Sequence, residues 1–172
     1  MIAAIPHVQS RLQMIPSPES TVDATQVLRR FRVVFNAVRS HFQQVEQQAG
    51  LGGAQVWALS VIRERPGVGM GEIAKAMDIH QSTASNLIKT LVRRELIVMT
   101  RHPADRRNAQ LSIAPAGQAV LAKVPGPFEG VLPQALASLP AETLQRLDQD
   151  LDELVRVLKA DEGAGSIPLA QL

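Results

Sequence analysis

Apolar residues recur every three or four positions across residues 20–49, and this spacing predicts one long amphipathic helix. The apolar positions of this helix are Val27, Leu28, Phe31, Val34, Phe35, Val38, Phe42 and Val45. The glycine-rich stretch 50–53 is predicted to end it. A second helix is predicted over residues 54–65, because the Pro66-Gly67 pair that follows is a strong terminator.

Two more helices, separated by a tight turn, are predicted in residues 69–95. The first covers residues 69–77, and its predicted buried side consists of Ile73, Ala74 and Met77. The second covers residues 81–95, and its predicted buried face consists of Ala84, Leu87, Ile88 and Leu91. The opposite face carries small polar and basic residues, none of them acidic: Ser82, Ser85, Asn86, Lys89 and Arg93. A short helix, a turn and a second helix with such an outer face is typical of a helix-turn-helix.

Two strands are predicted after these helices, at residues 96–101 and 108–113. The tip between them holds three arginines, a histidine and an aspartate within residues 100–107. A hairpin in this place makes the unit a winged helix. Such a charged tip could simply face water, or it could bind a negatively charged partner.

The remainder of the chain is predicted to be helical. Helices are expected at residues 116–124 and 128–137, because the prolines at 125 and 127 interrupt the pattern between them. A last helix starts near Pro140, since proline is tolerated in a first turn. It carries a continuous apolar seam, made of Leu144, Leu147, Leu151, Leu154, Val155 and Leu158. An apolar tail, residues 167–172, follows the glycines at 163 and 165.

These elements predict a mainly α fold, a winged helix-turn-helix with a small two-stranded β-wing and long N- and C-terminal dimerisation helices. The predicted boundaries are an N-terminal arm at 1–19, a dimerisation helix at 20–50, the winged helix-turn-helix at 51–115, C-terminal dimerisation helices at 116–162 and a tail at 163–172. The arm contains three prolines and no sustained period, and is expected to be mobile or ordered by a partner.

Composition narrows the classes of function. The chain has 172 residues, 45% of them hydrophobic but only 3% aromatic, so a single domain with an aliphatic core is expected. So few aromatics disfavour a base-stacking platform for single-stranded nucleic acid. The absence of cysteine excludes disulfides, thiolate nucleophiles and thiol redox switches. No apolar run reaches the ~20 residues of a membrane span and no secretory signal is present, so a cytoplasmic location is expected.

The charge is unevenly distributed along the chain. Residues 63–107 carry nine basic and five acidic groups, whereas residues 140–172 carry three basic and seven acidic groups. The basic middle of the chain therefore favours a polyanionic partner.

Nothing in the sequence indicates catalysis. The four histidines, at positions 7, 41, 80 and 102, are dispersed, and there is no paired-carboxylate site or glycine-rich phosphate loop. The acidic group at residues 148–153 has the spacing of a solvated helix face. The chain is therefore not expected to be an enzyme, and neither a cofactor nor a metal is expected.

Four stretches in order resemble the MarR (multiple antibiotic resistance regulator) family: Leu51–Leu59, Pro66–Met77, Ser82–Leu91 and His102–Arg107. The resemblance covers about residues 30–120 and implies a dimeric winged-helix transcription regulator. The chain departs from the family pattern at two element junctions. Glu95 stands where the family usually has glycine, and Ala114-Pro115 stands where it usually has Leu-Thr.

The resemblance implies a site for double-stranded DNA. It places residues 81–93 in the major groove as the recognition helix, where Asn and Gln can pair with adenine and Lys can contact phosphate. At the wing it implies that Asp105 orients Arg107 into the minor groove. The implied contact residues are Gln81, Ser82, Thr83, Ser85, Asn86, Lys89, Arg93, Arg101, Arg106 and Arg107.

The two long seams predict a dimer interface, because little else in the chain is left to cover them. The interface residues expected are Val27, Phe31, Leu147, Leu151, Leu154 and Leu158. The alternative is that both seams pack on their own domain. A homodimer would place two recognition helices on a near-palindromic operator.

The family also commonly binds small aromatic or phenolic ligands between the dimerisation helices and the winged domain. The candidates for such a site are Phe35, Phe42, Trp57 and Arg63, with ordinary core packing as the alternative for the aromatic residues. The function expected is a homodimeric DNA-binding repressor that such a ligand releases from its operator. The alternative is a winged helix that binds protein, which would be expected to show an apolar or acidic recognition face.

Overall fold

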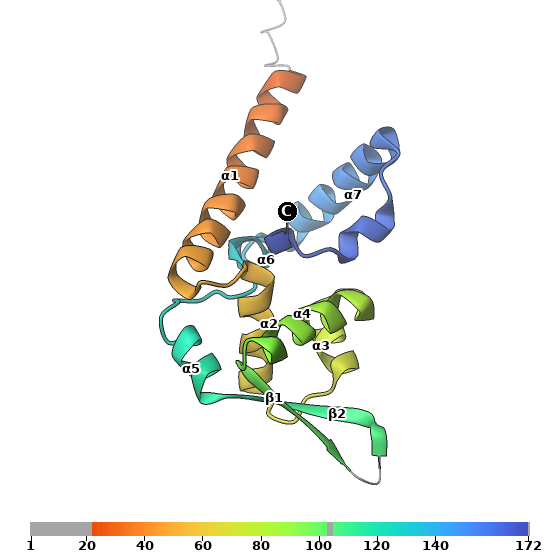
Figure 1. Ribbon diagram of the computed structural model, residues 1–172. Helices are drawn as coiled ribbons and strands as arrows, with labels where there is room; N and C mark the ends of the chain where they lie inside the picture. The colour runs from red at the N-terminus through yellow and green to blue at the C-terminus, as the bar shows by residue number, and fades with distance from the viewer. Residues whose placement is uncertain (1–21, 103–104, 172) are drawn as a thin grey trace, which may run out of the picture.

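The computed structural model describes residues 22–102 and 105–171, and side chains within that part except at residues 101–108. The predicted arm at 1–19 lies outside the described residues. Helices and strands follow in the order α1 Ala24–Ala49, α2 Gly53–Glu64, α3 Met70–Ala76, α4 Gln81–Arg93, β1 Ile97–His102, β2 Asp105–Ile113, α5 Pro115–Leu121, α6 Val131–Ala137 and α7 Ala141–Leu158 (Figure 1). Two short 3-10 helices follow, η1 Glu162–Ser166 and η2 Leu169–Gln171.

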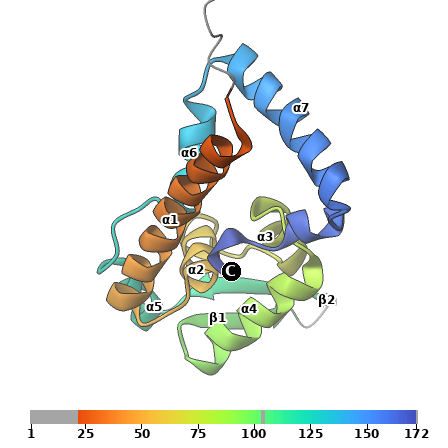
Figure 2. The same ribbon diagram turned by 90° about the horizontal axis from the view of Figure 1, so that it is seen from above.

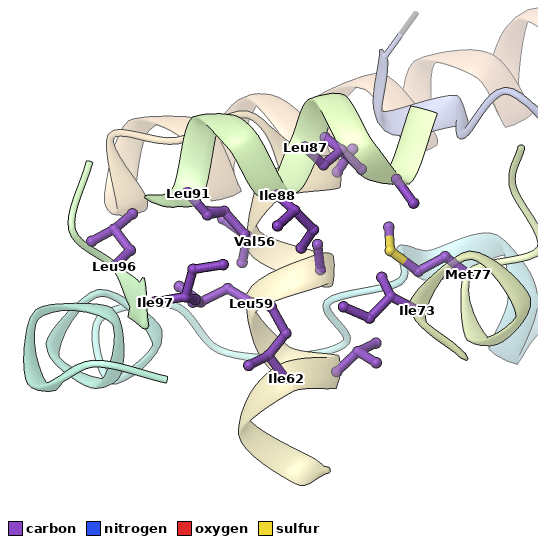
Figure 3. Packing of buried hydrophobic residues seen from close by; sticks show 14 of the residues in the cluster. Val56, Leu59, Ile62, Ile73, Met77, Leu87, Ile88, Leu91, Leu96 and Ile97 are labelled. Atoms are coloured by element: carbon purple, nitrogen blue, oxygen red, sulfur yellow. The ribbon is translucent and has the colours of Figure 1, made fainter. Parts of the chain in front are cut away.

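The core of the winged helix lies where α2, α3 and α4 meet, and it is aliphatic as predicted. Figure 3 shows Leu87, Ile88 and Leu91 of α4 directed toward α2, with Ile73 and Met77 reaching in from α3. The predicted buried faces of α3 and α4 are confirmed, since every residue assigned to them is buried. Burial of an aliphatic side chain of this size contributes about 1.5–3 kcal/mol, so this cluster dominates the stability of the unit.

The wing is an antiparallel pair, β1 with β2, whose register runs from Ile97 opposite Ile113 to Arg101 opposite Ala109. The register shifts between Arg101 and His102, and β2 begins at Asp105, earlier than the predicted residue 108. A short segment before α3 joins the sheet, because Leu111 N donates to Val68 O at 3.0 Å and Gly67 N donates to Leu111 O at 2.8 Å. This link anchors the base of the wing to the helix-turn-helix.

Each helix of the helix-turn-helix ends in a left-handed residue that is not glycine. Asp78 follows α3 with a φ of 51°, and Glu95 follows α4 with a φ of 57°. After α4, Leu96 N donates to Leu91 O at 3.0 Å and Glu95 N donates to Val92 O at 2.9 Å. This pair of bonds forms a Schellman motif, in which the left-handed position favours glycine. The turn therefore has the geometry for which the family uses glycine, although Glu95 occupies the position.

The second departure from the family pattern also fits its place. Pro115 is the first residue of α5, where its missing N–H is not needed. Ala114 N donates to Leu96 O at 3.0 Å and so fixes the start of α5 beside β1. Gly117 is essential to this packing, since a Cβ there would lie 2.2 Å from Leu96 O.

Helices α1 and α7 project from the same side of the winged helix (Figure 1). Asp23 begins α1, its side chain accepting from Gln26 N at 2.7 Å, and Gly50 ends it in a left-handed conformation. Only Val38 and Val45 of α1 are buried, and no residue of α7 is buried. Both apolar seams therefore stay largely uncovered within one chain.

The chain returns to its own body after α7. The last helix ends at Leu158, and the segment beyond it runs back toward α1 and α2 (Figure 2). Its residue Pro168 is buried, and Ala170 packs against the hydrophobic core. Among the described residues, no helix is both long enough and apolar enough to cross a membrane.

Candidate nucleic-acid interface

The outer face of α4 presents polar and basic side chains. Gln81, Ser82, Asn86, Lys89 and Arg93 are exposed, while Thr83 and Ser85 are half-buried. The helix starts at Gln81, so these residues lie along its whole length from the first turn. With no acidic group among them, the face is suited to approach a polyanion.

Arg93 is held along the axis of its own helix. Its Nη2 donates to Thr90 Oγ1 at 3.2 Å, and the Thr90 hydroxyl donates to Asn86 O at 3.1 Å. The guanidinium is thus kept near the C-terminal end of α4, away from the leading residues Gln81 and Ser82.

An open groove of about 900 Å³ separates α4 from the wing. Its walls are formed by Gln81, Ser85 and Lys89 of α4 and by Met99 and Gln110 of the sheet, with the start of α3 as its third side. The start of α3 contributes one carboxylate, that of Glu72, which accepts from Gly69 N at 2.9 Å and caps the helix. This bond fixes the position of the carboxylate, and the groove wall therefore carries one acidic and one basic side chain, Glu72 and Lys89.

The wing candidates are Arg101, Asp105, Arg106 and Arg107, and their side chains lie outside the described part of the structure. The backbone places Arg101 in β1 and the other three at the start of β2, at the end of the hairpin farthest from α5 (Figure 1). The bracing of Arg107 by Asp105 remains a prediction from the resemblance.

Arg94 is a residue that the sequence reasoning did not single out. Its Nη1 donates to Gly50 O at 2.8 Å, which ties the end of α4 to the end of α1. The two residues are 44 positions apart, and no local pattern in the sequence signals their contact.

The structure brings together some of the ligand-site candidates but not all. Phe42 and Trp57 line one hollow of about 400 Å³, which we call the α1–α2–α6 hollow because Val38, Leu132 and Leu136 complete its apolar wall. This volume lies within the range of small-molecule sites.

Phe35 lines a neighbouring hollow that also contains Phe42. Arg63 lies in neither hollow. Its guanidinium carbon is 5.3 Å from the centre of the Phe128 ring, and its Nη2 is 3.8 Å from Glu64 Oε1.

The dimer candidates are partly or fully exposed in the single chain. Val27, Leu151 and Leu158 are exposed, while Phe31, Leu147 and Leu154 are half-buried.

In the part of the chain that the structure describes, no three His, Asp or Glu side chains gather where they could hold a metal ion.

Comparison with known proteins agrees with this geometry. Residues 49–108 match the model of the MarR family. A putative transcriptional regulatory protein for the hcr operon of Thauera aromatica is 30% identical over 97 residues, which are 56% of this chain and 57% of that protein. The chain thus spans little more than half the length of this relative. The HTH-type transcriptional repressor MdtR of Bacillus subtilis is 21% identical over 131 residues, which are 76% of this chain and 84% of that protein.

Solved structures share the fold. A MepR-like protein complexed with pseudoligands superposes with a TM-score of 0.54 at 15% identity, covering 80% of this chain and 98% of that one. The S. aureus MepR–DNA complex gives a TM-score of 0.52 at 19% identity, with 79% and 98% coverage. BpsR of Bordetella bronchiseptica, whose DNA binding is regulated by 6-hydroxynicotinic acid, gives 0.51 at 25% identity, with 75% and 98% coverage.

Proposed function

Because the winged-helix region of this chain, residues 49–108, belongs to the MarR family, we propose that the protein is a homodimeric, sequence-specific DNA-binding transcription repressor. Its operator is near-palindromic, and a small aromatic or phenolic ligand releases it. The relatives named above are transcription regulators, and one solved neighbour is bound to DNA.

The observation that carries this proposal is the outer face of α4. Small polar side chains let a helix approach base edges closely, and Asn86 and Gln81 supply the amide groups that pair with adenine. Lys89 and Arg93 lie toward the C-terminal half of the helix, where they contact phosphates. The groove between α4 and the wing has room for a DNA backbone.

The distribution of exposed apolar side chains supports the homodimer. Every large exposed hydrophobic residue among those described, except Val98, lies in residues 22–35 or 144–169. Uncovered apolar faces of this extent mark protein interfaces. A two-fold dimer formed through α1 and α7 presents two copies of α4, which matches a palindromic operator.

The same distribution disfavours a winged helix that binds protein through α4. A protein-binding face would carry apolar anchors at its centre. Here the described face of α4 carries none, and the exposed apolar residues lie on other elements.

The ligand is placed in the α1–α2–α6 hollow, between a dimerisation helix and the winged unit. Phe42 and Trp57 supply aromatic walls there. A ligand in this position contacts both α1 and α2. If it binds more tightly to a different arrangement of α1 relative to α2, its binding changes the distance between the two α4 helices of the dimer.

The DNA contacts can be tested by measuring affinity as a function of salt. Sequences bound from a random pool of duplex DNA are identified first, and the affinity for the best of them is then followed by fluorescence anisotropy between about 50 and 200 mM salt. Binding through 6–10 phosphates weakens about 10³–10⁵-fold over this range. Lys89→Ala is expected to weaken binding to all sequences, and Arg107→Ala to weaken binding most at A·T-rich sites.

Lys123→Ala serves as the control, since Lys123 is exposed beyond the end of α5 and its substitution removes the same charge. Salt-independent binding, or an equal loss in Lys89→Ala and Lys123→Ala, would contradict the proposed interface.

A further inference from the structure

The segment Ile167–Gln171, which we call the C-terminal segment, is seated on the body of the molecule. Pro168 is buried, and Ala170 packs against the core. A Cβ added at Gly53, the first residue of α2, would lie 2.4 Å from Phe42 Cδ1 and 3.1 Å from Ala170 Cβ, so a side chain there would crowd both α1 and the segment. The segment therefore occupies a fitted position at the junction of α1 and α2.

The C-terminal segment separates two hollows. Leu169 lines the α1–α2–α6 hollow of about 400 Å³ on one side. It also lines the neighbouring hollow of about 550 Å³ on the other side, together with Phe35 and Ala170. Val38 and Phe42 of α1 border both hollows, so the two are parts of one trough that the segment crosses. Its wall is apolar at Val38 and Phe42 and polar at Arg39, Gln43 and Glu46.

We propose that the C-terminal segment is a built-in occupant of this trough, and that a larger apolar ligand binds there by displacing it. Displacement of the segment by a ligand rests on the effector site of the proposed function. The position of the segment in the trough does not depend on that function. Leu169 is 39% exposed and borders both hollows, so a ligand that spans them needs the position that its side chain takes. Asp78 and Glu129 line the α1–α2–α6 hollow, and Arg39 and Glu46 line the neighbouring one. Three of these four charged side chains are acidic, which favours a neutral or cationic ligand over an aromatic acid.

Displacement of the segment would also free one end of α7. No residue of α7 is buried, and the chain beyond Leu158 regains contact with the body from Gly165 onward, chiefly through the C-terminal segment. The segment thus anchors the C-terminal end of the helix that carries the predicted dimer seam. Ligand binding in the trough is in this way coupled to the position of α7.

The fluorescence of a native tryptophan can test this proposal. Trp57 is the only tryptophan and there is no tyrosine, so intrinsic fluorescence reports on the α1–α2–α6 hollow alone. The full chain, Leu169→Asp and Gln171→Asp are compared by acrylamide quenching of Trp57 and by titration with Nile red, a neutral apolar dye. Gln171 is exposed in the same short helix, so its variant matches the introduced charge without touching the trough.

In Leu169→Asp we expect stronger quenching of Trp57 and tighter binding of Nile red. If the segment occupies the trough about nine-tenths of the time, its release tightens the apparent affinity about tenfold. Gln171→Asp is expected to match the parent in both measurements. Leu169→Ala should change both in the same direction by a smaller amount, and the far-UV circular dichroism of all variants should stay that of the parent.

Parent-like quenching and dye affinity in Leu169→Asp would overturn the inference, and so would equal changes in Leu169→Asp and Gln171→Asp. Either result would leave the proposed function standing, because DNA affinity of the parent chain is measured separately. Loss of DNA binding by the parent, with the fluorescence results as expected, would instead remove the proposed function and keep the seating of the segment.

Discussion

Glu95 adopts the left-handed backbone conformation that the Schellman motif after α4 requires, with a φ of 57°. For a residue with a Cβ, this conformation costs roughly 1–2 kcal/mol relative to the right-handed region. Its neighbours leave no alternative, because Leu96 must turn into the core to begin the wing while its N–H reaches back to Leu91 O. The strain is therefore local to one residue.

Glu95→Gly should raise the stability of the protein by about 1 kcal/mol. Glycine removes the Cβ clash, and its larger loss of backbone entropy on folding offsets part of the gain. The measurement is thermal unfolding at fixed protein concentration, where such a change raises the midpoint by about 2–4 °C.

Glu95→Ala separates the backbone effect from the loss of the carboxylate. It keeps the Cβ in the left-handed conformation, so its midpoint should stay near that of the parent. An equal rise in both variants would show that the negative charge, and not the backbone, limits stability at this turn.

At the scale of elements, the packing of α5 against β1 depends on the absence of a side chain at Gly117. A Cβ there would lie 2.2 Å from Leu96 O and 2.9 Å from a side-chain carbon of Ile113. Gly71 of α3 is the opposite case, since a Cβ added there meets nothing within 4 Å. The two glycines thus serve different purposes within short helices.

Gly117→Ala should destabilise the protein by about 1–3 kcal/mol, because α5 must move away from the sheet to relieve the overlap. Gly71→Ala should stabilise it by up to about 1 kcal/mol, because alanine has the higher helix propensity. Urea unfolding curves of the two variants test both expectations. A parent-like midpoint in Gly117→Ala would mean that α5 is not packed as described.

The helices and strands with the clearest periodicity were predictable from the sequence. The buried faces of α3 and α4 follow from the 3.6-residue period, since Ile73, Met77, Ile88 and Leu91 all point into one core. The start of β2 was predicted too late, because the irregular register near His102 adds strand residues with no alternating pattern.

Contacts between distant segments were not predictable. The bond from Arg94 to Gly50 O and the seating of Pro168 depend on how elements pack in space, and neither has a local signature. Of the ligand-site candidates, Phe42 and Trp57 meet in one hollow, while Arg63 is drawn away to the ring of Phe128. Sequence spacing identifies an apolar stripe but not the neighbour that each of its residues contacts.

For the whole molecule, α1 and α7 are the elements through which we propose that two chains assemble. Their apolar seams are largely uncovered, and both helices project from the same side of the winged helix (Figure 1). Covering them with a second copy removes the largest exposed apolar surface in the described part of the chain.

Leu151→Asp should convert the protein into monomers, because it places a charge in the middle of the α7 seam, where Leu151 is 37% exposed in the single chain. Size-exclusion chromatography with light scattering measures the mass directly. Gln149→Asp is the control, since Gln149 lies on the opposite side of α7 and is already exposed. A dimer that persists in Leu151→Asp would place the interface elsewhere.

The uncovered seams of α1 and α7 have a consequence for how the protein is measured and used. When assembly buries them, folding and association become one equilibrium, and the unfolding midpoint rises with total protein concentration by mass action. On the proposed operator with two half-sites, which would select the assembled form, occupancy would grow more steeply than linearly with the number of chains. The exposed apolar surface of the single chain would thus make operator occupancy depend steeply on protein concentration.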